Sequence, residues 1–545
     1  MSGIEVKEEA VATVRRLKNE LVAIVGAEHV RDDESIRTLH SQDIWSSGQH
    51  QVALVAAPAS VEQISELLKS VRQAGYAIAP RGAGMSYTGA YLANSARTVS
   101  LDMSRMDRII DINAADMTVT VEPGCTWAAL LAALAPLGLR TPFWGPMSGL
   151  MSTVGGGLSQ LNAMLGAGHY GTSSESLVAL TVVLGDGQVL RTGARGAEGN
   201  APFYRHYGPD LAGLFCGDGS AFGIKAQITL RLIRSPKHED YASFSFQTGR
   251  DLLNAMAEMA RAGVACEMCA FDPGLTKVRM QRASLASDVK TLSAVVGRQK
   301  SLVKGLFEAG KIALAGRDFV GGDDYSLHMI AEGRSAAGVQ TDIAEARRIA
   351  TEHRGQEIAN TIAKVIRAQP FPPLNSVLGP VGERWAPVHG VAPLSTAADL
   401  FDAIQQVFAD MAADFKRHGI SVGYLFTTMS TNAFVVEPVF YWPGSRQPVH
   451  AAAMQPEHLA KLPSLPDDPA ATAVVVAARK RIIALFERFG CGHFQIGRTY
   501  PYRQSRDAAA WQLVESIKAA VDPALLLNPG VLGLGLGLAG TGDAA

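Results

Sequence analysis

The glycine-rich stretch at residues 80–90, PRGAGMSYTGA, constrains the fold of this 545-residue chain more than any other feature. It follows directly on a short apolar run, residues 77–80, which the sequence predicts to be a strand. Such a loop can turn consecutive backbone amides to one side, and glycines let a ligand approach the backbone closely. No helix follows, so the loop is not the GxGxxG turn of a Rossmann unit. The loop is therefore either a tight turn or a cradle for an anionic group such as a phosphate.

Strands and helices alternate in the first 240 residues. Residues 60–76 carry apolar side chains at helical spacing, and Ser60 is their expected N-cap. Strands are expected at 51–58, 97–104, 108–124 (a hairpin-like pair), 176–193 (strand, turn and strand) and 223–236, and a helix at 126–138. This pattern predicts an α+β fold with mixed sheets.

The chain changes character after about residue 240. We expect helices at 251–263, 341–366 and 396–418, a proline-rich joint at 368–376, strands at 421–429 and 432–442, and an exposed loop at 451–470. The length implies more than one domain. We expect residues 1–240, completed by 500–545, to form one domain and residues 241–499 to form a second.

Composition excludes several classes of protein. The net charge of −1 provides no broad field for nucleic acid, and no apolar stretch is long enough for a signal peptide or a membrane-spanning helix. The five cysteines are sparse and odd in number, so neither a disulfide framework nor a zinc site is expected. We therefore expect a cytoplasmic protein without a metal.

Three further stretches support a binding role for the first loop. Residues 146–177 contain Ser152, Thr153 and three consecutive glycines, residues 214–232 place glycines ahead of a strand, and residues 521–533 read VDPALLLNPGVLG. In this order and spacing the stretches resemble the vanillyl-alcohol oxidase and p-cresol methylhydroxylase superfamily of FAD-linked oxidoreductases. The resemblance implies a PCMH-type FAD-binding domain of two α+β subdomains and a cap domain with an antiparallel sheet and flanking helices.

The resemblance also implies which residues hold FAD. The first loop would bind the pyrophosphate, the triple glycine would pass near the ribityl chain or ring, and later residues would contact the adenine half or approach from the C-terminal segment. The expected cofactor-binding residues are Pro80, Arg81, Gly82, Ala83, Gly84, Met85, Ser86, Tyr87, Ser152, Thr153, Gly156, Gly157, His169, Gly171, Gly223, Ile224 and Asn528.

The flavin is expected to be held without a covalent bond. Many relatives attach it through a cap-domain histidine, but Asn432, Ala433 and Phe434 stand at the matching strand here. The first loop has no histidine and residues 152–157 have no cysteine, so a second kind of attachment is also missing. A tyrosyl link remains an open alternative.

Several side chains are candidates for catalysis. By resemblance, Arg498 would stabilise the developing oxyanion of the substrate, although a surface ion pair is the alternative. His389 or His493 would act as the base, and for His389 the alternative is a histidine of the core. If HFQIG at 493–497 is a strand, His493 and Gln495 share one face. Glu437 would accept a proton, pair with Arg498 or face solvent, and Tyr170 lies beside the expected ring-binding loop.

The leading prediction is an FAD-dependent oxidoreductase that takes hydride from a benzylic-type alcohol or a para-alkylphenol. The alternative is a D-2-hydroxy-acid dehydrogenase of lactate or glycolate type, which the absence of an HxGDGNxH-like metal motif at 427–434 weakens. A third hypothesis is an FAD-binding subunit that relays electrons or scaffolds a complex. The expected partners are a small-molecule substrate and an acceptor that is oxygen, a quinone or a cytochrome, with the 451–470 loop as a contact in a homodimer.

Overall fold

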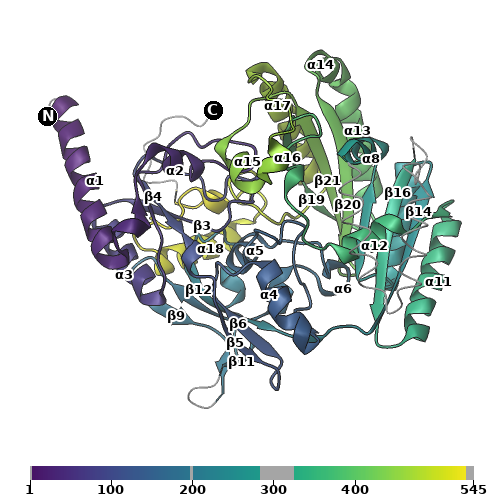
Figure 1. Cartoon of the computed structure of the whole chain (residues 1–545), viewed down its shortest axis with the longest axis horizontal. Coiled ribbons are helices and arrows are strands. Elements are labelled where there is room, and N and C mark those ends of the chain that lie inside the picture. The colour runs from purple at the N-terminus through teal and green to yellow at the C-terminus, as the bar shows by residue number, and fades with distance from the viewer. Residues whose placement is uncertain (1–2, 197–200, 283–323, 536–545) are drawn as a thin grey trace.

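Two sheets make up the N-terminal part of the molecule in this computed structural model, which describes residues 3–196, 201–282 and 324–535 (Figure 1). The first sheet has the order β1-β2-β4-β3, and β2, β4 and β3 run parallel. Helix α3 (Val61–Gln73) is capped by Ser60, whose side chain accepts from the Gln63 amide, as the sequence predicts. The strands are β1 (Val30–Arg31), β2 (Leu54–Ala56), β3 (Ala77–Arg81) and β4 (Thr98–Asp102).

The second sheet is antiparallel and has five strands in the order β5-β6-β12-β8-β9. Between the strands of this sheet the chain forms three short helices, α4 (Trp127–Leu134), α5 (Val154–Gln160) and α6 (Ala167–Tyr170). The strands are β5 (Ile109–Asn113), β6 (Thr118–Val121), β8 (Leu177–Val183), β9 (Val189–Arg191) and β12 (Ile224–Arg231). These bounds confirm the expected strands, although the strand at 223–236 breaks after Arg231.

An eight-stranded antiparallel sheet forms the other part of the molecule, and the α+β class is confirmed. One face packs on helices α7 (Gly249–Ala262), α11 (Ala336–Glu352), α13 (Ala397–Asp410) and α17 (Pro469–Arg488) in a single apolar core. The strands are β14 (His238–Phe246), β15 (Glu267–Phe271), β16 (Tyr325–Gly333), β17 (Gln356–Ile358), β18 (Arg384–Pro387), β19 (Gly390–Pro393), β20 (Ser421–Met429) and β21 (Ala433–Trp442).

Alternation along β21 separates this core from the opposite face of the sheet. Phe434, Val436 and Phe440 pack among the helices, whereas Val435, Glu437 and Val439 point to the other side and line a cavity. A strand places successive side chains on opposite faces, so one ten-residue segment contributes both to the core and to the cavity.

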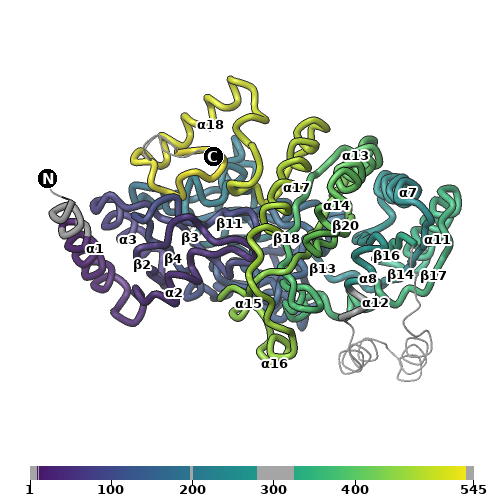
Figure 2. Tube along the Cα trace, turned by 90° about the horizontal axis from the view of Figure 1, so that it is seen from above, coloured from purple at the N-terminus to yellow at the C-terminus, as the bar shows by residue number. Residues whose placement is uncertain are grey.

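Three expected elements differ in the structure. The segment at 341–366 is two helices, α11 and α12 (Thr361–Ala368), separated by strand β17, because the chain turns at Arg354 with a positive φ of 61°. The stretch 451–470 is not an open loop: it holds the end of α15 (Pro448–Ala453) and all of α16 (Pro456–Leu459). Both helices lie between the N-terminal part and the large sheet (Figures 1 and 2).

The third difference is at 493–497, which forms bends and turns rather than a strand, with Gln495 at a φ of 49°. None of the helices in the described ranges is both long and apolar enough to span a bilayer.

A buried cluster of charges joins the two parts. Arg367 of α12 lies 3.4 Å from a Glu267 oxygen and donates to Glu332 at 3.1 Å, and Arg140 of β7 (Leu139–Arg140) also pairs with Glu332. The Trp144 indole donates to Glu267 at 3.2 Å. Burial would raise the pKa of Glu332, but the two guanidinium groups outweigh burial and lower it. Each charge in this junction is therefore offset by a neighbour.

Replacing Arg367 by methionine tests this junction. The change leaves Glu267 and part of Glu332 without a counter-charge in a buried site, which costs about 3–5 kcal/mol of the free energy of unfolding. We expect the urea midpoint to fall accordingly. Arg417→Met is the control, because the Arg417 side chain is 70% exposed in its pair with Asp414. Equal midpoints for the two variants would contradict the proposed importance of the cluster.

Candidate functional site

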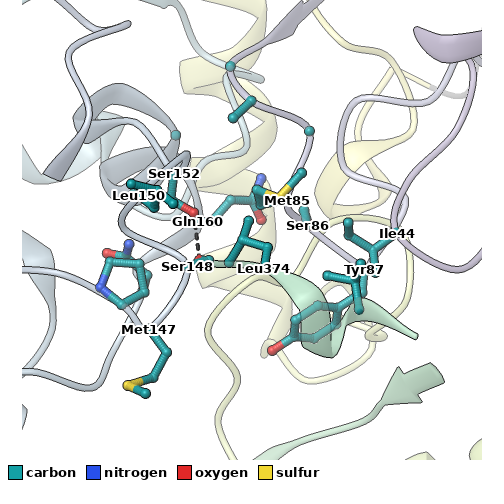
Figure 3. Close-up of a pocket in the computed structure, with 18 of the residues that line it drawn as sticks. Ile44, Met85, Ser86, Tyr87, Met147, Ser148, Leu150, Ser152, Gln160 and Leu374 are labelled. Atoms are coloured by element: carbon teal, nitrogen blue, oxygen red, sulfur yellow. Dashed lines mark hydrogen bonds between the residues drawn. The ribbon is translucent and has the colours of Figure 1, made fainter. Parts of the chain in front are cut away.

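A large cavity lies between the glycine loop, helix α5 and the free face of the eight-stranded sheet (Figure 3). Its volume is about 1480 Å³. A pocket for one drug-sized ligand has roughly 300–1,000 Å³, so the cavity has room for a large cofactor and a second molecule. The site residues expected from the sequence that line it are Pro80, Gly82, Ala83, Gly84, Met85, Ser86, Tyr87, Ser152, Thr153, Gly156, Gly157, Ile224 and Glu437.

The amides of the glycine loop are free, whereas three of its carbonyls accept hydrogen bonds. The backbone amides of residues 82–87 donate no hydrogen bond to any described protein atom. In contrast, the Tyr91 hydroxyl donates to Gly84 O at 2.6 Å, Ile44 N to Ser86 O at 3.2 Å, and the Trp45 indole to Tyr87 O at 2.8 Å. Exposed amides on one side of a loop form an anion-binding nest.

Arg81 and Gly84 set the shape of this nest. Gly84 has a φ of +73°, and a Cβ added there would lie 2.2 Å from Arg81 Nη2. The Arg81 guanidinium lies over the Tyr91 ring at 5.6 Å, and its buried Nε has no partner among the described residues. A cation beneath free amides suits a pyrophosphate.

Helix α5 supplies a bare backbone surface opposite the loop. Its N-cap Thr153 accepts from the Gly156 amide at 3.1 Å, and Gly155 has no room for a Cβ because Pro123 lies 2.5 Å from that position. Beyond the glycines, the buried Gln160 Oε1 and Asn162 Oδ1 have no hydrogen-bond partner among the described residues. Both residues line the cavity, and buried acceptors of this kind favour a ligand that carries N–H groups. FAD fits this set of donors, acceptors and bare backbone.

Tyr87, Glu437 and Gln495 form a hydrogen-bonded group in the same cavity. The Tyr87 hydroxyl donates to Glu437 Oε2 at 3.3 Å and accepts from Gln495 Nε2 at 3.0 Å. Burial, followed by the Glu437 charge, raises the pKa of Tyr87 well above its usual value, so Tyr87 stays protonated. Trp385, whose ring lies 5.9 Å from that of Tyr87, and Tyr441 complete an aromatic wall.

His389 and His493 do not line the cavity. The His389 ring is fully buried and stacks on Phe494 at 3.9 Å, and its Nε2 lies 2.6 Å from Phe494 O. His493 stacks on Tyr500 at 3.9 Å. Burial lowers the pKa of His389 to about 3 and that of His493 to about 4, so both are neutral at neutral pH. Neither histidine lines the cavity, and the His389 ring lies 5.9 Å from the Tyr87 ring on the side away from it. His389 is therefore part of the core.

Arg498 and Asn528 hold the glycine loop from outside the cavity. The Arg498 amide donates to Thr88 O at 2.9 Å, and its guanidinium donates to Gly89 O and to Pro529 O at 2.5 and 2.7 Å. Asn528 Nδ2 donates to Ala90 O at 2.7 Å and to Gly219 O at 2.6 Å. Burial lowers the pKa of Arg498 to about 10. Neither side chain reaches the space beside Glu437.

Other expected site residues lie elsewhere. His169, Tyr170 and Gly171 border a separate, more open pocket of about 390 Å³, together with Asn432 and Ala433. Gly223 packs against Val182, where a Cβ would lie 2.3 Å away, and it is the next residue, Ile224, that lines the cavity. Arg81 lies beneath the loop rather than at the cavity wall. In the described ranges, no group of three or more potential ligands is close enough to hold a metal ion.

Sequence reasoning missed three lining residues, Gln160, Asn162 and Trp385, and it missed the role of Gln495. Strand alternation could not indicate that role, because the segment of Gln495 is a turn.

Comparisons with known proteins agree with this geometry. A family described as FAD binding domain matches residues 52–193, and one described as FAD linked oxidases, C-terminal domain, matches residues 496–532. A glycolate oxidase subunit of Bacillus subtilis is 29% identical over 221 residues, covering 41% of this chain and 45% of the relative. A probable D-lactate dehydrogenase of Danio rerio is 30% identical over 254 residues, covering 46% and 50%. The matches thus span about half the length of these relatives.

Solved structures share the fold over nearly the whole chain. p-Cresol methylhydroxylase with substrate bound has a TM-score of 0.71 at 16% identity, covering 96% of this chain and 97% of the other. 4-Ethylphenol oxidase from Gulosibacter chungangensis has a TM-score of 0.69 at 18% identity, with the same coverage. At this identity the likeness establishes the fold.

Gly84→Ala tests the nest. The new Cβ displaces Arg81 and the loop, so we expect FAD to bind at least about tenfold more weakly, equivalent to 1.4 kcal/mol. Binding is measured by titrating the apoprotein with FAD. Gly138→Ala is the matched control, because Gly138 has a similar φ of +66° but nothing lies within 4 Å of its added Cβ. Equal FAD affinity in the two variants would show that the loop does not hold the cofactor.

The buried His389 makes stability depend on pH. Its folded pKa of about 3 lies below the ordinary 6.5, so its contribution is complete above pH 6.5 and is lost as pH falls toward 3. The free energy of unfolding should fall by about 1.4 kcal/mol per pH unit for this residue. His389→Gln should flatten the profile by that slope, whereas Tyr500→Phe, which keeps the imidazole, should not. Parallel profiles for His389→Gln and the unmodified protein would contradict a neutral buried histidine.

The glycine loop lies in the range matched by the first family, and the C-terminal segment that holds the loop lies in the range matched by the second. The fold shared with p-cresol methylhydroxylase also covers the large sheet. The residues around the cavity fit FAD by their free amides, buried acceptors and bare backbone. The chain therefore carries an FAD-binding domain at residues 52–193 and a segment of FAD-linked oxidase type at residues 496–532, and it has the fold of p-cresol methylhydroxylase.

Proposed function

We propose that the chain is an FAD-dependent oxidoreductase that takes hydride from an uncharged benzylic-type alcohol or a para-alkylphenol. The observation that carries this proposal is the Tyr87–Glu437–Gln495 group, set in an aromatic and apolar part of the cavity. Residues 1–240 with 500–545 would form the FAD-binding domain, and residues 241–499 would form the cap that supplies Glu437.

The proposed cofactor site uses the two bare surfaces. The amides of residues 82–87 would hold the pyrophosphate, and Gly156 and Gly157 would lie against the ribityl chain or ring. FAD, when bound, supplies the hydride acceptor. A substrate C–H must be held in a fixed pose near it, and the wall of Trp385 and Tyr441 provides such a surface.

The proposed proton acceptor is Glu437. Its Oε2 already accepts a hydrogen bond from the Tyr87 hydroxyl. A substrate hydroxyl that donates to Tyr87 Oη or to Glu437 can therefore pass its proton to this carboxylate. Gln495 donates to Tyr87 Oη and so fixes the direction of the hydroxyl. Both Tyr87 and Glu437 are only 9% exposed, which keeps water from competing with the substrate.

Charge beside Glu437 favours an uncharged substrate over a 2-hydroxy acid. A substrate carboxylate there would meet a like charge, and no arginine lines the cavity among the described residues. Two lysines line it: Lys225 already pairs with Asp218 at 2.7 Å, and Lys461 shares its part of the lining with Glu457. The names of the glycolate oxidase and D-lactate dehydrogenase relatives favour the alternative, a D-2-hydroxy-acid dehydrogenase, which therefore remains the second candidate. The electron acceptor would be oxygen, a quinone or a cytochrome.

Anaerobic flavin reduction separates these candidates. We expect 4-methoxybenzyl alcohol or 4-ethylphenol to bleach the flavin absorbance and D-lactate not to. Glu437→Gln should slow the reduction by roughly 10²–10⁴-fold, because a general base is lost. Glu515→Gln, an exposed change on α18 (Ala508–Val521), is the control.

Reduction by D-lactate alone would establish the second candidate. Reduction by neither class of substrate would favour a subunit that only binds FAD.

A further inference from the structure

An apolar chamber forms the outer part of the cavity. It is made of Met85, Met147, Leu150, Phe371 and Leu374, which come from the glycine loop, the loop that follows β7, and the proline-rich segment 369–377. Met85, Met147, Leu150 and Leu374 face the same space in Figure 3. Leu150 is 45% exposed, and the side chains of Met85, Met147 and Phe371 are partly exposed to this space. Partly exposed apolar side chains that meet in a hollow indicate an apolar ligand.

Phe371 is fixed in this chamber by two glycines. A Cβ on Gly149 would lie 2.4 Å from the Phe371 ring, and one on Gly145 would lie 2.6 Å from it. The ring also contacts Trp144 edge-on, with 6.1 Å between centroids. A side chain at either glycine would push the ring away, so the position of Phe371 depends on both glycines.

The chamber wall is tied to a polar rim. Asn375 Nδ2 donates to Gln455 Oε1 at 2.9 Å, and the Gln455 amide donates to Asn375 Oδ1 at 3.2 Å. Glu457 and Lys461 follow on the same rim. The two bonds join the proline-rich segment to the start of α16, so the apolar wall lies inside a ring of polar groups.

The chamber is continuous with the proposed catalytic group. Tyr87 and Leu374 belong to one apolar cluster, with Met85 and Trp385 packed against it. A substrate whose hydroxyl reaches Tyr87 therefore has apolar surface on the side that leads outward. The cavity volume of about 1480 Å³ also exceeds the roughly 300–1,000 Å³ of a pocket for a single ligand.

We propose that the substrate carries an apolar extension, an alkyl chain or second ring of several carbons on the aromatic ring, and that the chamber binds this extension. Phe371 is the specificity-determining residue, because its ring sets the width of the chamber. This inference rests on the proposed function for the reacting end of the substrate. It adds the chemical class of the other end of the substrate, an apolar extension that makes no polar contact with Tyr87, Glu437 or Gln495.

A series of 4-alkoxybenzyl alcohols tests the extension. In anaerobic flavin reduction by the holoenzyme, the ratio of the limiting reduction rate to Kd should rise from methoxy through butoxy to hexyloxy by roughly fourfold for each buried methylene group. The rise should come from Kd, because the extension interacts equally before and during hydride transfer. A flat series in which the flavin is still reduced would overturn the chamber proposal but leave the proposed function intact.

Binding without turnover separates the two proposals. 4-Alkoxybenzonitriles have no benzylic hydrogen, and their affinity for the holoenzyme, measured by calorimetry, should rise with chain length in the same way. If no alcohol reduces the flavin but the nitriles show this rise, the proposed function fails and the chamber stands. If the nitriles show no dependence on length, the chamber proposal fails.

Two variants test Phe371 itself. Phe371→Ala widens the chamber, and the preference for hexyloxy over methoxy should fall at least about tenfold for lack of packing. Gly149→Ala displaces the ring and should lower the same ratio without changing residue 371. Leu513→Ala, 62% exposed on α18, is the control and should keep the ratio. An unchanged ratio in both Phe371→Ala and Gly149→Ala would exclude Phe371 as the determinant.

Discussion

The site depends on one backbone loop whose carbonyl groups bond the protein while its amide groups stay free for a ligand. Between residues 84 and 90, carbonyl oxygens accept from fixed donors, among them Tyr91, Trp45, Arg498 and Asn528, while the amides of residues 82–87 remain free. A peptide unit whose carbonyl is held on one side directs its N–H to the other. The bonds to Gly84 O and Ser86 O therefore direct the amides of residues 85 and 87 away from the protein atoms that hold the loop. Arg81 and the bare backbone of α5 add a cation and a second surface to this nest.

Local patterns in the sequence predicted the fold and most of the glycine-loop and α5 residues that line the cavity. The helix after Ser60 and the glycine loop after the strand at residue 77 depend on capping and backbone freedom, which neighbouring residues determine. Glu437 was also predictable, because it lies on an alternating strand. These features need little knowledge of distant parts of the chain.

The roles of Arg498 and His389 required the tertiary structure. Nothing in GRTYPY indicates that the arginine bonds loop carbonyls more than 400 positions earlier in the chain, and nothing around His389 indicates that Phe494 and Tyr500 enclose it. Gln495 has a positive φ that sequence alternation cannot anticipate. From sequence alone, a polar residue near an expected site can either contact the ligand or hold the residues that do. Only contacts between distant parts of the chain decide which role it has.

The bonds from Arg498 and Asn528 to the loop have a consequence for biosynthesis. Residues 82–90 emerge early during translation, but their carbonyl partners at 498 and 528 emerge last. A nascent chain that has not yet released residues 498 and 528 from the ribosome has the loop without these supports. The loop therefore gains its full set of bonds only after more than 400 further residues have been synthesised.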